Sequence, residues 1–170
     1  MSDHPGLPVP PEFPVAVTTA RLRLILVSVE DAADMMAGRR QQRWHHDYPR
    51  PDDVDAASMV RDGPQLDPWG PRHLVFEQQA VGGIGFYGPP VDGEAEVGFG
   101  LVAEVRGLGL VSEALAALLA ETDRLDVRVR ASVVPTNRPS IRVLAAAGFT
   151  ELRGSTPEGE LVMVRPLVAP

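Results

Sequence analysis

A short glycine turn that joins a predicted strand to a predicted helix constrains the fold more than any other stretch of this sequence. Residues 96–101 (EVGFGL) alternate between apolar side chains and charged or glycine positions, a period of two that is typical of a strand. From Leu110 onward the apolar residues recur at helical spacing, which predicts a helix over residues 110–123. The turn between them reads Arg106-Gly-Leu-Gly109. The sequence therefore predicts a strand, a tight turn and a helix in direct succession.

The start of that helix is suited to binding an anion. Backbone N–H groups there are unpaired and the helix dipole is positive, and glycine lets a phosphate approach them without meeting a side chain. The turn lacks the Lys-Ser/Thr of a nucleotide P-loop and the third glycine of a dinucleotide fingerprint. A phosphate-binding turn and a plain strand-to-helix turn therefore both remain open on this stretch alone.

Residues 106–111 resemble the signature of the GCN5-related N-acetyltransferases (GNATs), which is Arg or Gln, any two residues, Gly, any residue, then Gly or Ala. Val111 departs from this signature because its side chain is branched where the family has a small residue. The flanking Glu-Val-Gly-Phe-Gly-Leu and Ser-Glu-Ala are most similar to the branch of the ribosomal-protein N-terminal acetyltransferases. Asn137-x-x-Ser140, with Gly148-Phe149 after it, resembles the second motif of the family. The resemblance covers roughly residues 18–167.

This resemblance implies that the chain binds acetyl-CoA as its acyl donor. The pantetheine arm would lie along the strand near Phe99–Val102, and the pyrophosphate would rest on the amides of about Gly107–Ser112. A backbone N–H near Val102 would stabilise the oxyanion of the thioester carbonyl. The residues assigned to the acyl donor are Phe99, Gly100, Leu101, Val102, Arg106, Gly107, Leu108, Gly109, Leu110, Val111, Ser112 and Asn137.

The patterns and the resemblance together predict an α/β (α+β) fold. It has a mixed, mostly antiparallel central sheet of six to seven strands and about four helices, with the fourth and fifth strands splayed apart. Strands are predicted near residues 18–27, 73–77, 81–87, 96–101, 127–133, 149–153 and 161–165. Helices are predicted from Ser28 to about Arg40, over residues 52–62 and 110–123, and from Asn137 to Gly148. Ser28 and Asp31 are expected to form a capping box, with Asp in place of Glu, at the start of the first of them. Residues 1–17 form a proline-rich, extended or mobile lead-in, and residues 18–170 form the N-acetyltransferase domain.

Composition limits the class of protein further. The 170 residues are 44% hydrophobic and 23% charged, as expected of one globular domain. The net charge of −7, with every basic residue an arginine, argues against nonspecific nucleic-acid binding and suits a cationic acceptor, although acidity also serves solubility. With no cysteine, disulfides, thiolate metal sites and an acyl-cysteine intermediate are excluded. No apolar run or leader marks a membrane or secreted protein, so a cytoplasmic protein is expected.

Glu96 is the predicted general base that takes a proton from the acceptor amine, because it lies on the central strand just before the expected site. Glu94 shares its face of the strand and is the alternative base, and a surface carboxylate is the plain structural explanation for either. For the acid that protonates the departing thiolate, many members of the resembled family have a tyrosine shortly after the Gly-Phe of the second motif, and this chain has none there. The resemblance implies Ser140 in this role, because it matches the serine of the ribosomal-protein branch. Asn137 and Ser140 are also competent helix-start residues, so capping and a role in the site are both open.

Two adjacent histidines, His45 and His46, fall in a loop that the resemblance places on the acceptor side. Without a third ligand at suitable spacing they predict no metal site, and solvated loop histidines are the alternative to a substrate contact. The expected function is therefore an acetyl-CoA-dependent N-acetyltransferase acting on a primary amine of a protein N-terminus or small molecule, without a metal and with a homodimer kept open. An inactive acyl-CoA-binding regulatory or interaction module is the alternative.

Overall fold

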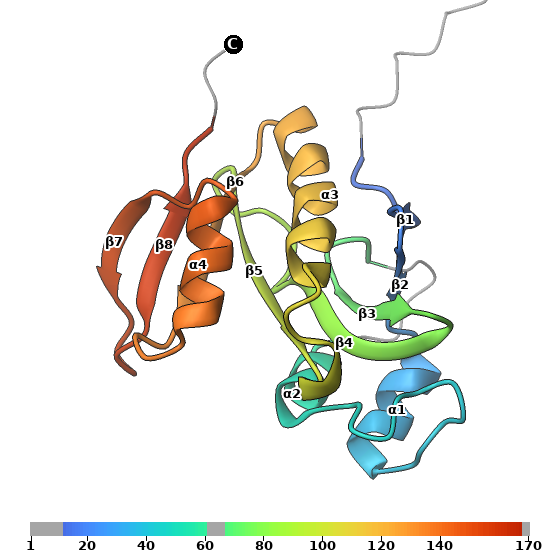
Figure 1. Ribbon diagram of the computed structural model, residues 1–170. Helices are drawn as coiled ribbons and strands as arrows, with labels where there is room; N and C mark the ends of the chain where they lie inside the picture. Colours follow the sequence, from blue (N-terminus) through green and yellow to red (C-terminus); the bar gives the residue numbers. More distant parts are fainter. Residues whose placement is uncertain (1–11, 61–66, 168–170) are drawn as a thin grey trace, which may run out of the picture.

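The computed structural model describes residues 12–60 and 67–167, and their central feature is one eight-stranded sheet (Figure 1). The strand order is β1-β2-β3-β4-β5-β6-β8-β7. The strands are β1 (Val17–Thr18), β2 (Leu22–Leu26), β3 (Pro71–Phe76), β4 (Gln79–Phe86), β5 (Glu94–Leu101), β6 (Arg128–Val133), β7 (Glu151–Ser155) and β8 (Leu161–Arg165). The helices are α1 (Val29–Ala37), α2 (Pro51–Ala57), the short 3-10 turn η1 (Ala103–Val105), α3 (Leu110–Arg124) and α4 (Arg138–Ala146).

The sheet is mixed and mostly antiparallel, as predicted. One more strand is present than the six to seven expected, because the first predicted strand is divided by a turn in which the Thr19 N–H donates to the Leu22 carbonyl at 2.8 Å. β5 and β6 form the parallel pair, and their register covers three positions, from Glu94↔Arg128 to Glu96↔Arg130. Beyond Glu96 the two strands separate. The fourth and fifth predicted strands, residues 96–101 and 127–133, correspond to β5 and β6. The predicted splay between them is therefore confirmed.

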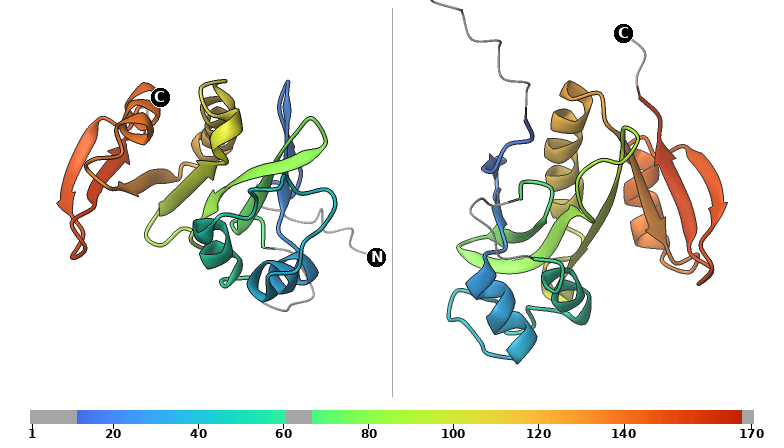
Figure 2. Two further views of the ribbon diagram at one scale, coloured as in Figure 1. Left: turned by 60° about the horizontal axis from the view of Figure 1, so that its bottom comes forward. Right: turned by 180° about the vertical axis from the view of Figure 1, so that it is seen from behind.

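The helices lie on both faces of the sheet. Figure 2 shows α3 and α4 on one side and α1 and α2 on the other. α3 packs against β1, β2, β5 and β6, and α4 packs against β6. The predicted apolar stripe of α3 is confirmed, since its core-facing residues are all buried: Leu110, Ala114, Leu115, Leu118, Leu119 and Thr122. α3 therefore closes the core on the side of the sheet where the glycine turn emerges.

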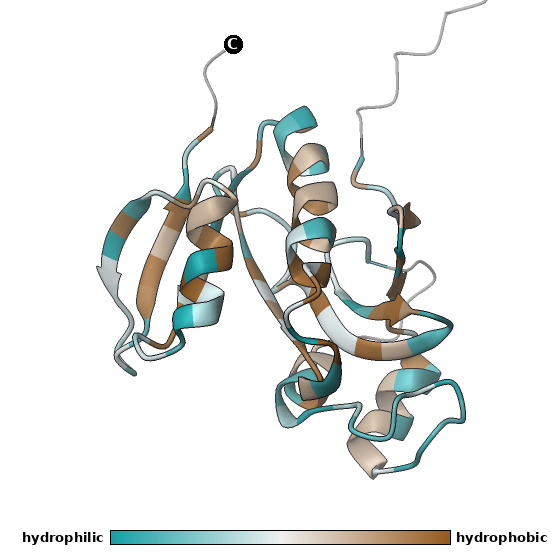
Figure 3. Ribbon diagram, in the orientation of Figure 1, coloured by the Kyte–Doolittle hydropathy of each residue, from teal (hydrophilic) through white to brown (hydrophobic). Residues whose placement is uncertain are grey.

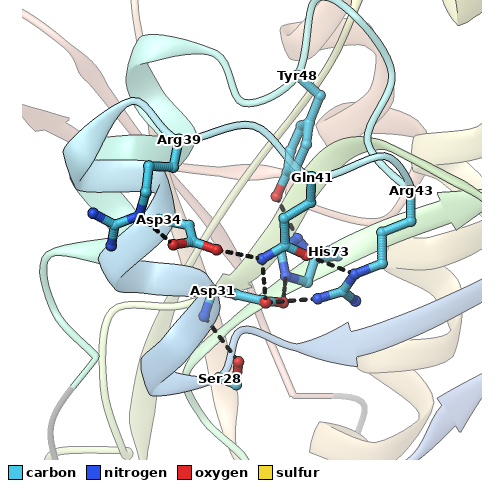
Figure 4. Close-up of polar contacts among 8 residues, drawn as sticks. All are labelled: Ser28, Asp31, Asp34, Arg39, Gln41, Arg43, Tyr48 and His73. Atoms are coloured by element: carbon cyan, nitrogen blue, oxygen red, sulfur yellow. Dashed lines mark hydrogen bonds and ion pairs between the residues drawn. The ribbon is translucent and has the colours of Figure 1, made fainter.

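α1 begins as predicted but ends earlier and uses its acidic residue differently. Ser28 caps it by accepting a hydrogen bond from the Asp31 N–H at 3.0 Å. Gly38, with φ 72°, ends the helix in the left-handed conformation, which glycine favours at this position, so the helix stops before the predicted Arg40. The Asp31 carboxylate does not complete a capping box. It is buried and bonded to other partners (Figure 4).

These partners tie the segment between α1 and α2 to the sheet. Asp31 accepts hydrogen bonds from Gln41 at 2.9 Å and Arg43 at 2.6 Å. Its other oxygen lies 2.8 Å from Nε2 of His73 on β3, and Nδ1 of that ring lies 2.6 Å from the Tyr48 hydroxyl. The segment is largely hydrophilic (Figure 3). Only a few of its side chains, Trp44 and Tyr48 among them, are buried in the core, and the polar network fixes it further.

The described end of the proline-rich lead-in packs against the sheet. Phe13 is 3% exposed and lies against Trp69 and Phe86, with ring centroids 4.6 and 5.5 Å away. The buried Arg72 donates to the carbonyls of Pro14 at 2.7 Å and Val15 at 2.6 Å. Residues 13–17 are thus held in place, so of the two expected forms, extended or mobile, the mobile one does not describe them. The division of the chain at residue 18 stays a prediction, and residues 1–11 of the lead-in lie outside the described part.

Among the described residues, no helix combines the length and the apolar character needed to cross a bilayer.

Candidate active site

The glycine turn adopts a backbone that requires glycine at two positions. Gly107 has φ 81° and Gly109 has φ 77°, values that L side chains rarely adopt. Gly109 is the N-cap residue of α3. Because glycine has no side chain, no side chain caps the first turn of the helix. A Cβ at Gly107 would meet nothing within 4 Å. The turn therefore presents an open surface directly in front of the helix start.

The backbone N–H groups of Leu110, Val111 and Ser112 precede the first intrahelical bond, in which the Glu113 N–H donates to the Gly109 carbonyl at 3.1 Å. They are the unpaired donors that every helix start exposes. The Val111 side chain, which departs from the family signature, packs against the hydrophobic core. Val111 is partly buried and also lines the cavity described below, so its side chain lies at the border between the core and the space in front of the helix.

Arg21 holds the turn from the opposite side. Its guanidinium bonds to Glu113 of α3 at 2.8 Å and donates to the carbonyl of Leu108 at 3.0 Å. These contacts tie the glycine turn and the first turn of α3 to the residue before β2. Sequence reasoning missed this arginine because it lies far from the turn in the chain.

A cavity of about 660 Å³ opens between β5, the turn and α4. The predicted site residues line it, except for Glu96, Val102 and Leu108. Its wall consists of Arg50, Asp52, Phe99, Gly100, Leu101, Arg106, Gly107, Gly109, Leu110, Val111, Ser112, Asn137, Pro139, Ser140, Arg142 and Val143. Three arginines and one aspartate give this wall a positive balance in a protein of net charge −7. The cavity is thus suited to an anionic ligand.

The strand pairing narrows the choice of the backbone amide near Val102 that is expected to stabilise the oxyanion. The Val102 N–H donates to the Val81 carbonyl of β4 at 2.8 Å and is not free. Because alternate backbone groups of a strand point to opposite sides, the Phe99 and Leu101 N–H groups face away from β4, into the gap left by the splay. Leu101, one residue earlier than Val102, is therefore the better candidate donor.

Asn137 and Ser140 lie at the α4 side of the cavity. Asn137 is the N-cap of α4, as predicted, and its Oδ1 accepts the Ser140 N–H at 3.3 Å. The Ser140 hydroxyl makes no hydrogen bond to any other described residue. Ser140 therefore contributes its backbone to the helix start and leaves its hydroxyl available to a ligand.

The two candidate bases, Glu96 and Glu94, differ sharply in their surroundings. Oε1 of Glu96 accepts from Ser132 at 3.1 Å and from Arg130 at 3.3 Å, and Oε2 has no partner among the described residues. Glu94 is held by Arg153, Arg128 and Arg130, each within 2.9 Å.

The hydrogen bond from Arg153, with those from Arg128 and Arg130, outweighs burial and lowers the pKa of Glu94 to about 2. A carboxylate so strongly stabilised is a poor proton acceptor.

A second cavity, of about 330 Å³, lies on the opposite face of β5, under α2. Its floor is formed by backbone without side chains at four positions, because two glycines of β4 face two of β5. The pairs are Gly83↔Gly100 and Gly85↔Gly98. A Cβ at Gly98 would collide with the Tyr87 hydroxyl, and one at Gly100 would collide with the Arg50 guanidinium. The Tyr87 and Arg50 side chains thus lie directly on this floor.

The two cavities share three wall residues, Arg50, Asp52 and Phe99. Arg50 is anchored by Asp53, which its Nε and Nη2 both approach at 3.1 Å, while its Nη1 has no partner among the described residues. Burial raises the pKa of Asp53. A ligand in the larger cavity and one in the smaller cavity would consequently meet near Phe99.

The histidine pair does not line either cavity. His45 is buried, with Nε2 bonded to Glu104 of η1 and Nδ1 accepting the Asp47 N–H at 3.0 Å. The His46 side chain is 76% exposed. Asp47 brings a third potential ligand within 4.8 Å of the two rings, but both nitrogens of His45 are already engaged. His45 therefore joins the segment before α2 to the turn before α3, a structural contact.

A family model for the acetyltransferase (GNAT) domain matches residues 21–150. The chain belongs to the GNAT acetyltransferase family. The match covers the glycine turn, Asn137 and Ser140, and so includes both stretches on which the sequence resemblance rested. A comparison with curated proteins finds no match.

Several solved structures share the fold. RimJ of Mycobacterium smegmatis, in complex with CoA-disulfide, is 21% identical, with 89% of this chain and 87% of that chain covered and a TM-score of 0.59. An acetyltransferase of Agrobacterium tumefaciens strain C58 is 22% identical, with 96% and 98% covered and a TM-score of 0.59. The microcin C7 self-immunity acetyltransferase MccE, in complex with acetyl-CoA and AMP, is 17% identical, with 88% and 93% covered and a TM-score of 0.61. A Vibrio cholerae protein described as a putative ribosomal-protein-serine acetyltransferase shares the fold as well, at 19% identity, with 88% and 95% covered and a TM-score of 0.56.

Proposed function

We propose that this protein transfers an acetyl group from acetyl-CoA to a primary amine, of a small molecule or a protein N-terminus. The single observation that carries the proposal is the meeting of two cavities at Phe99, one built for an anionic ligand and one open to an acceptor. RimJ and MccE are structures with CoA-disulfide and acetyl-CoA, respectively, and both share this fold.

The residues of the larger cavity fit acetyl-CoA. The N–H groups at the start of α3, in front of Gly107 and Gly109, suit its pyrophosphate, and Arg142 on the wall adds positive charge. The outward N–H groups of Phe99 and Leu101 suit an extended arm that pairs like an added strand. When bound, acetyl-CoA supplies an acetyl thioester. Because an inactive acyl-CoA-binding module would need the same amides, thiol release, not binding, separates the two functions.

Glu96 and Ser140 are the residues to which we assign proton transfer. Glu96 accepts the proton of the acceptor ammonium, because the nucleophile must be the neutral amine. Ser140, whose hydroxyl is unengaged on the cavity wall, donates toward the departing sulfur. The Leu101 N–H is the candidate donor to the developing oxyanion.

The acidic side of the smaller cavity favours a positively charged acceptor. Asp52 and Asp55 of α2 line it and have no ion-pair partner among the described residues. Carboxylates at such a wall attract an ammonium group and repel a carboxylate-bearing competitor. A primary amine, protonated in solution, matches this charge.

Release of free thiol from acetyl-CoA, measured with a panel of amines and N-terminal peptides, tests the proposal. We expect thiol release that depends on the amine, and a Glu96→Gln variant that keeps acetyl-CoA affinity but turns over roughly 10²–10⁴-fold more slowly. That loss should shrink as the pH rises, because the amine then loses its proton unaided. Tight acetyl-CoA binding with no thiol release for any amine would support the inactive module instead.

A further inference from the structure

The predicted base does not itself reach either cavity. Glu96 is absent from both walls, and Oε1 is held by Ser132 and Arg130 on the β6 side. An acceptor amine in the smaller cavity therefore needs another group to carry its proton to Glu96.

Tyr87 is the residue placed between them. It follows the last residue of β4, and its N–H donates to the Glu96 carbonyl at 2.9 Å. Because Phe86 pairs with Val97, Tyr87 and Glu96 are the next cross-strand neighbours, and their side chains emerge on the same face of the sheet. Tyr87 lines the smaller cavity. It thus contacts the acceptor space on one side and the neighbourhood of Glu96 on the other.

The Tyr87 hydroxyl is available to a ligand or a water on this face of the sheet. It lies over Gly98, two residues after Glu96 on the same face of β5, and makes no hydrogen bond to any other described residue. Desolvation and then the negative charge of Glu96 raise the pKa of Tyr87, so the hydroxyl keeps its proton at neutral pH. A protonated hydroxyl donates one hydrogen bond and accepts others.

The Tyr87 hydroxyl can lie on the sheet only because residue 98 is a glycine. Any residue larger than glycine at position 98 would displace the hydroxyl. The Arg50 guanidinium, over Gly100, borders the same space with its free Nη1. A positive charge there disfavours a protonated neighbour and so assists loss of the ammonium proton.

Resting on the acetyl-transfer function proposed above, we propose that the Tyr87 hydroxyl binds the acceptor amine and relays its proton to Glu96. The hydroxyl oxygen accepts the ammonium proton as the O–H proton passes to a bridging water. That water gives one of its own protons to Oε2 of Glu96, whose other oxygen Ser132 and Arg130 hold, and so ends unchanged. The N–H bond and the original O–H bond break, a new O–H bond forms on Tyr87 and another on Glu96. The amine is left neutral, Tyr87 is restored, and Glu96 later releases the proton to solvent.

The variant Tyr87→Phe tests the relay because it removes only the hydroxyl. The side chain is 56% exposed and its hydroxyl is unbonded, so the melting temperature should stay unchanged. We expect kcat/KM for a basic primary amine to fall about 10²-fold near neutral pH, with acetyl-CoA affinity unaltered. The loss should diminish as pH rises. It should also be small for a weakly basic amine, which is already neutral at the assay pH.

A double variant separates a shared path from two independent effects. If Tyr87 acts through Glu96, the combination of Tyr87→Phe with Glu96→Gln should cost little more than Glu96→Gln alone. Equal loss at every pH and for both kinds of amine would reduce Tyr87 to a packing residue and overturn the relay, as would unchanged turnover. Wild-type protein that acetylates no amine at all would instead refute the acetyl-transfer function, and the relay with it.

Discussion

At the scale of single residues, Ser140 allows a structural role to be tested apart from a catalytic one, because its backbone N–H and its side-chain hydroxyl have different surroundings. Its backbone N–H bonds to Asn137 at 3.3 Å, and this bond survives any side-chain substitution except proline. Its hydroxyl faces the cavity wall without a partner among the described residues. A change confined to the hydroxyl therefore probes chemistry and leaves the helix start intact.

We predict that Ser140→Ala lowers turnover modestly, by about 10²-fold at most, with unchanged acetyl-CoA affinity and melting temperature. The effect should be small because a thiol with a pKa of about 8.5 is already a fair leaving group. Asn137→Ala is the matched control, since it removes the cap and should cost about 1 kcal/mol of stability. Turnover in Ser140→Ala equal to that of wild type would remove the residue from the proton-transfer steps.

At the scale of elements, the sequence predicted those whose signals are local. The caps at Ser28 and Asn137 and the apolar stripe of α3 each rest on neighbouring residues, as does the glycine turn. The residues that were missed act across distance in the chain. Arg50 reaches Gly100, Tyr87 reaches Gly98, and Arg21 reaches Leu108.

One local signal for those contacts was present. Four glycines at alternate positions, 83 and 85 on one strand and 98 and 100 on the next, mark a bare sheet face, and bare faces accommodate close neighbours. Which side chains occupy that face depends on the strand pairing, which a single sequence does not specify. The same limit applies to Asp31, whose sequence position predicts a cap but whose actual partners include His73 on a distant strand.

The network around His73 makes the α1–α2 side of the molecule sensitive to acid. Burial, opposed by the bond to Asp31, holds the pKa of His73 below its ordinary value. Burial works against ionisation of Asp31 as well, but bonds from Gln41 and His73 keep its pKa below normal. At neutral pH the network therefore contains a neutral histidine and an ionised aspartate.

Both shifts predict the same sign of pH dependence. The unfolded chain takes up a proton at His73 near pH 6.5, while the folded state resists it, so stability falls as pH drops below about 6.5. Asp31 adds a further loss once pH falls through its unfolded value of about 3.9.

We predict that the melting temperature decreases between pH 7.5 and 5, and that His73→Gln flattens this decrease. The variant should be less stable at pH 7.5 by about 1–3 kcal/mol, the cost of unsatisfied buried partners. His46→Gln, at an exposed position, is the control and should leave the slope unchanged. An identical slope in His73→Gln and wild type would assign the acid sensitivity to other groups.

At the scale of the whole molecule, the sheet consists of two parts joined at a narrow junction. β1 to β5 form one part and β6, β8 and β7 the other, and the β5–β6 register that joins them covers three residue pairs. The larger cavity spans the widening gap, with β5 and α3 on one side and α4 on the other. A ligand in this cavity would contact both parts of the sheet beyond Glu96, where β5 and β6 are no longer paired.

We therefore predict that acetyl-CoA raises the melting temperature and slows amide exchange on both sides of the gap, at the start of α3 and along α4. A ligand bound only by the folded state adds RT ln(1 + [L]/Kd), about 2.7 kcal/mol at a hundredfold excess over Kd. Arg142→Glu should shrink the shift, because Arg142 is an exposed arginine of α4 on the cavity wall and its reversal repels the phosphates. Protection confined to α3 would mean that the ligand binds the glycine turn without bridging the two parts of the sheet, and an unmoved melting temperature at millimolar acetyl-CoA would exclude the site altogether.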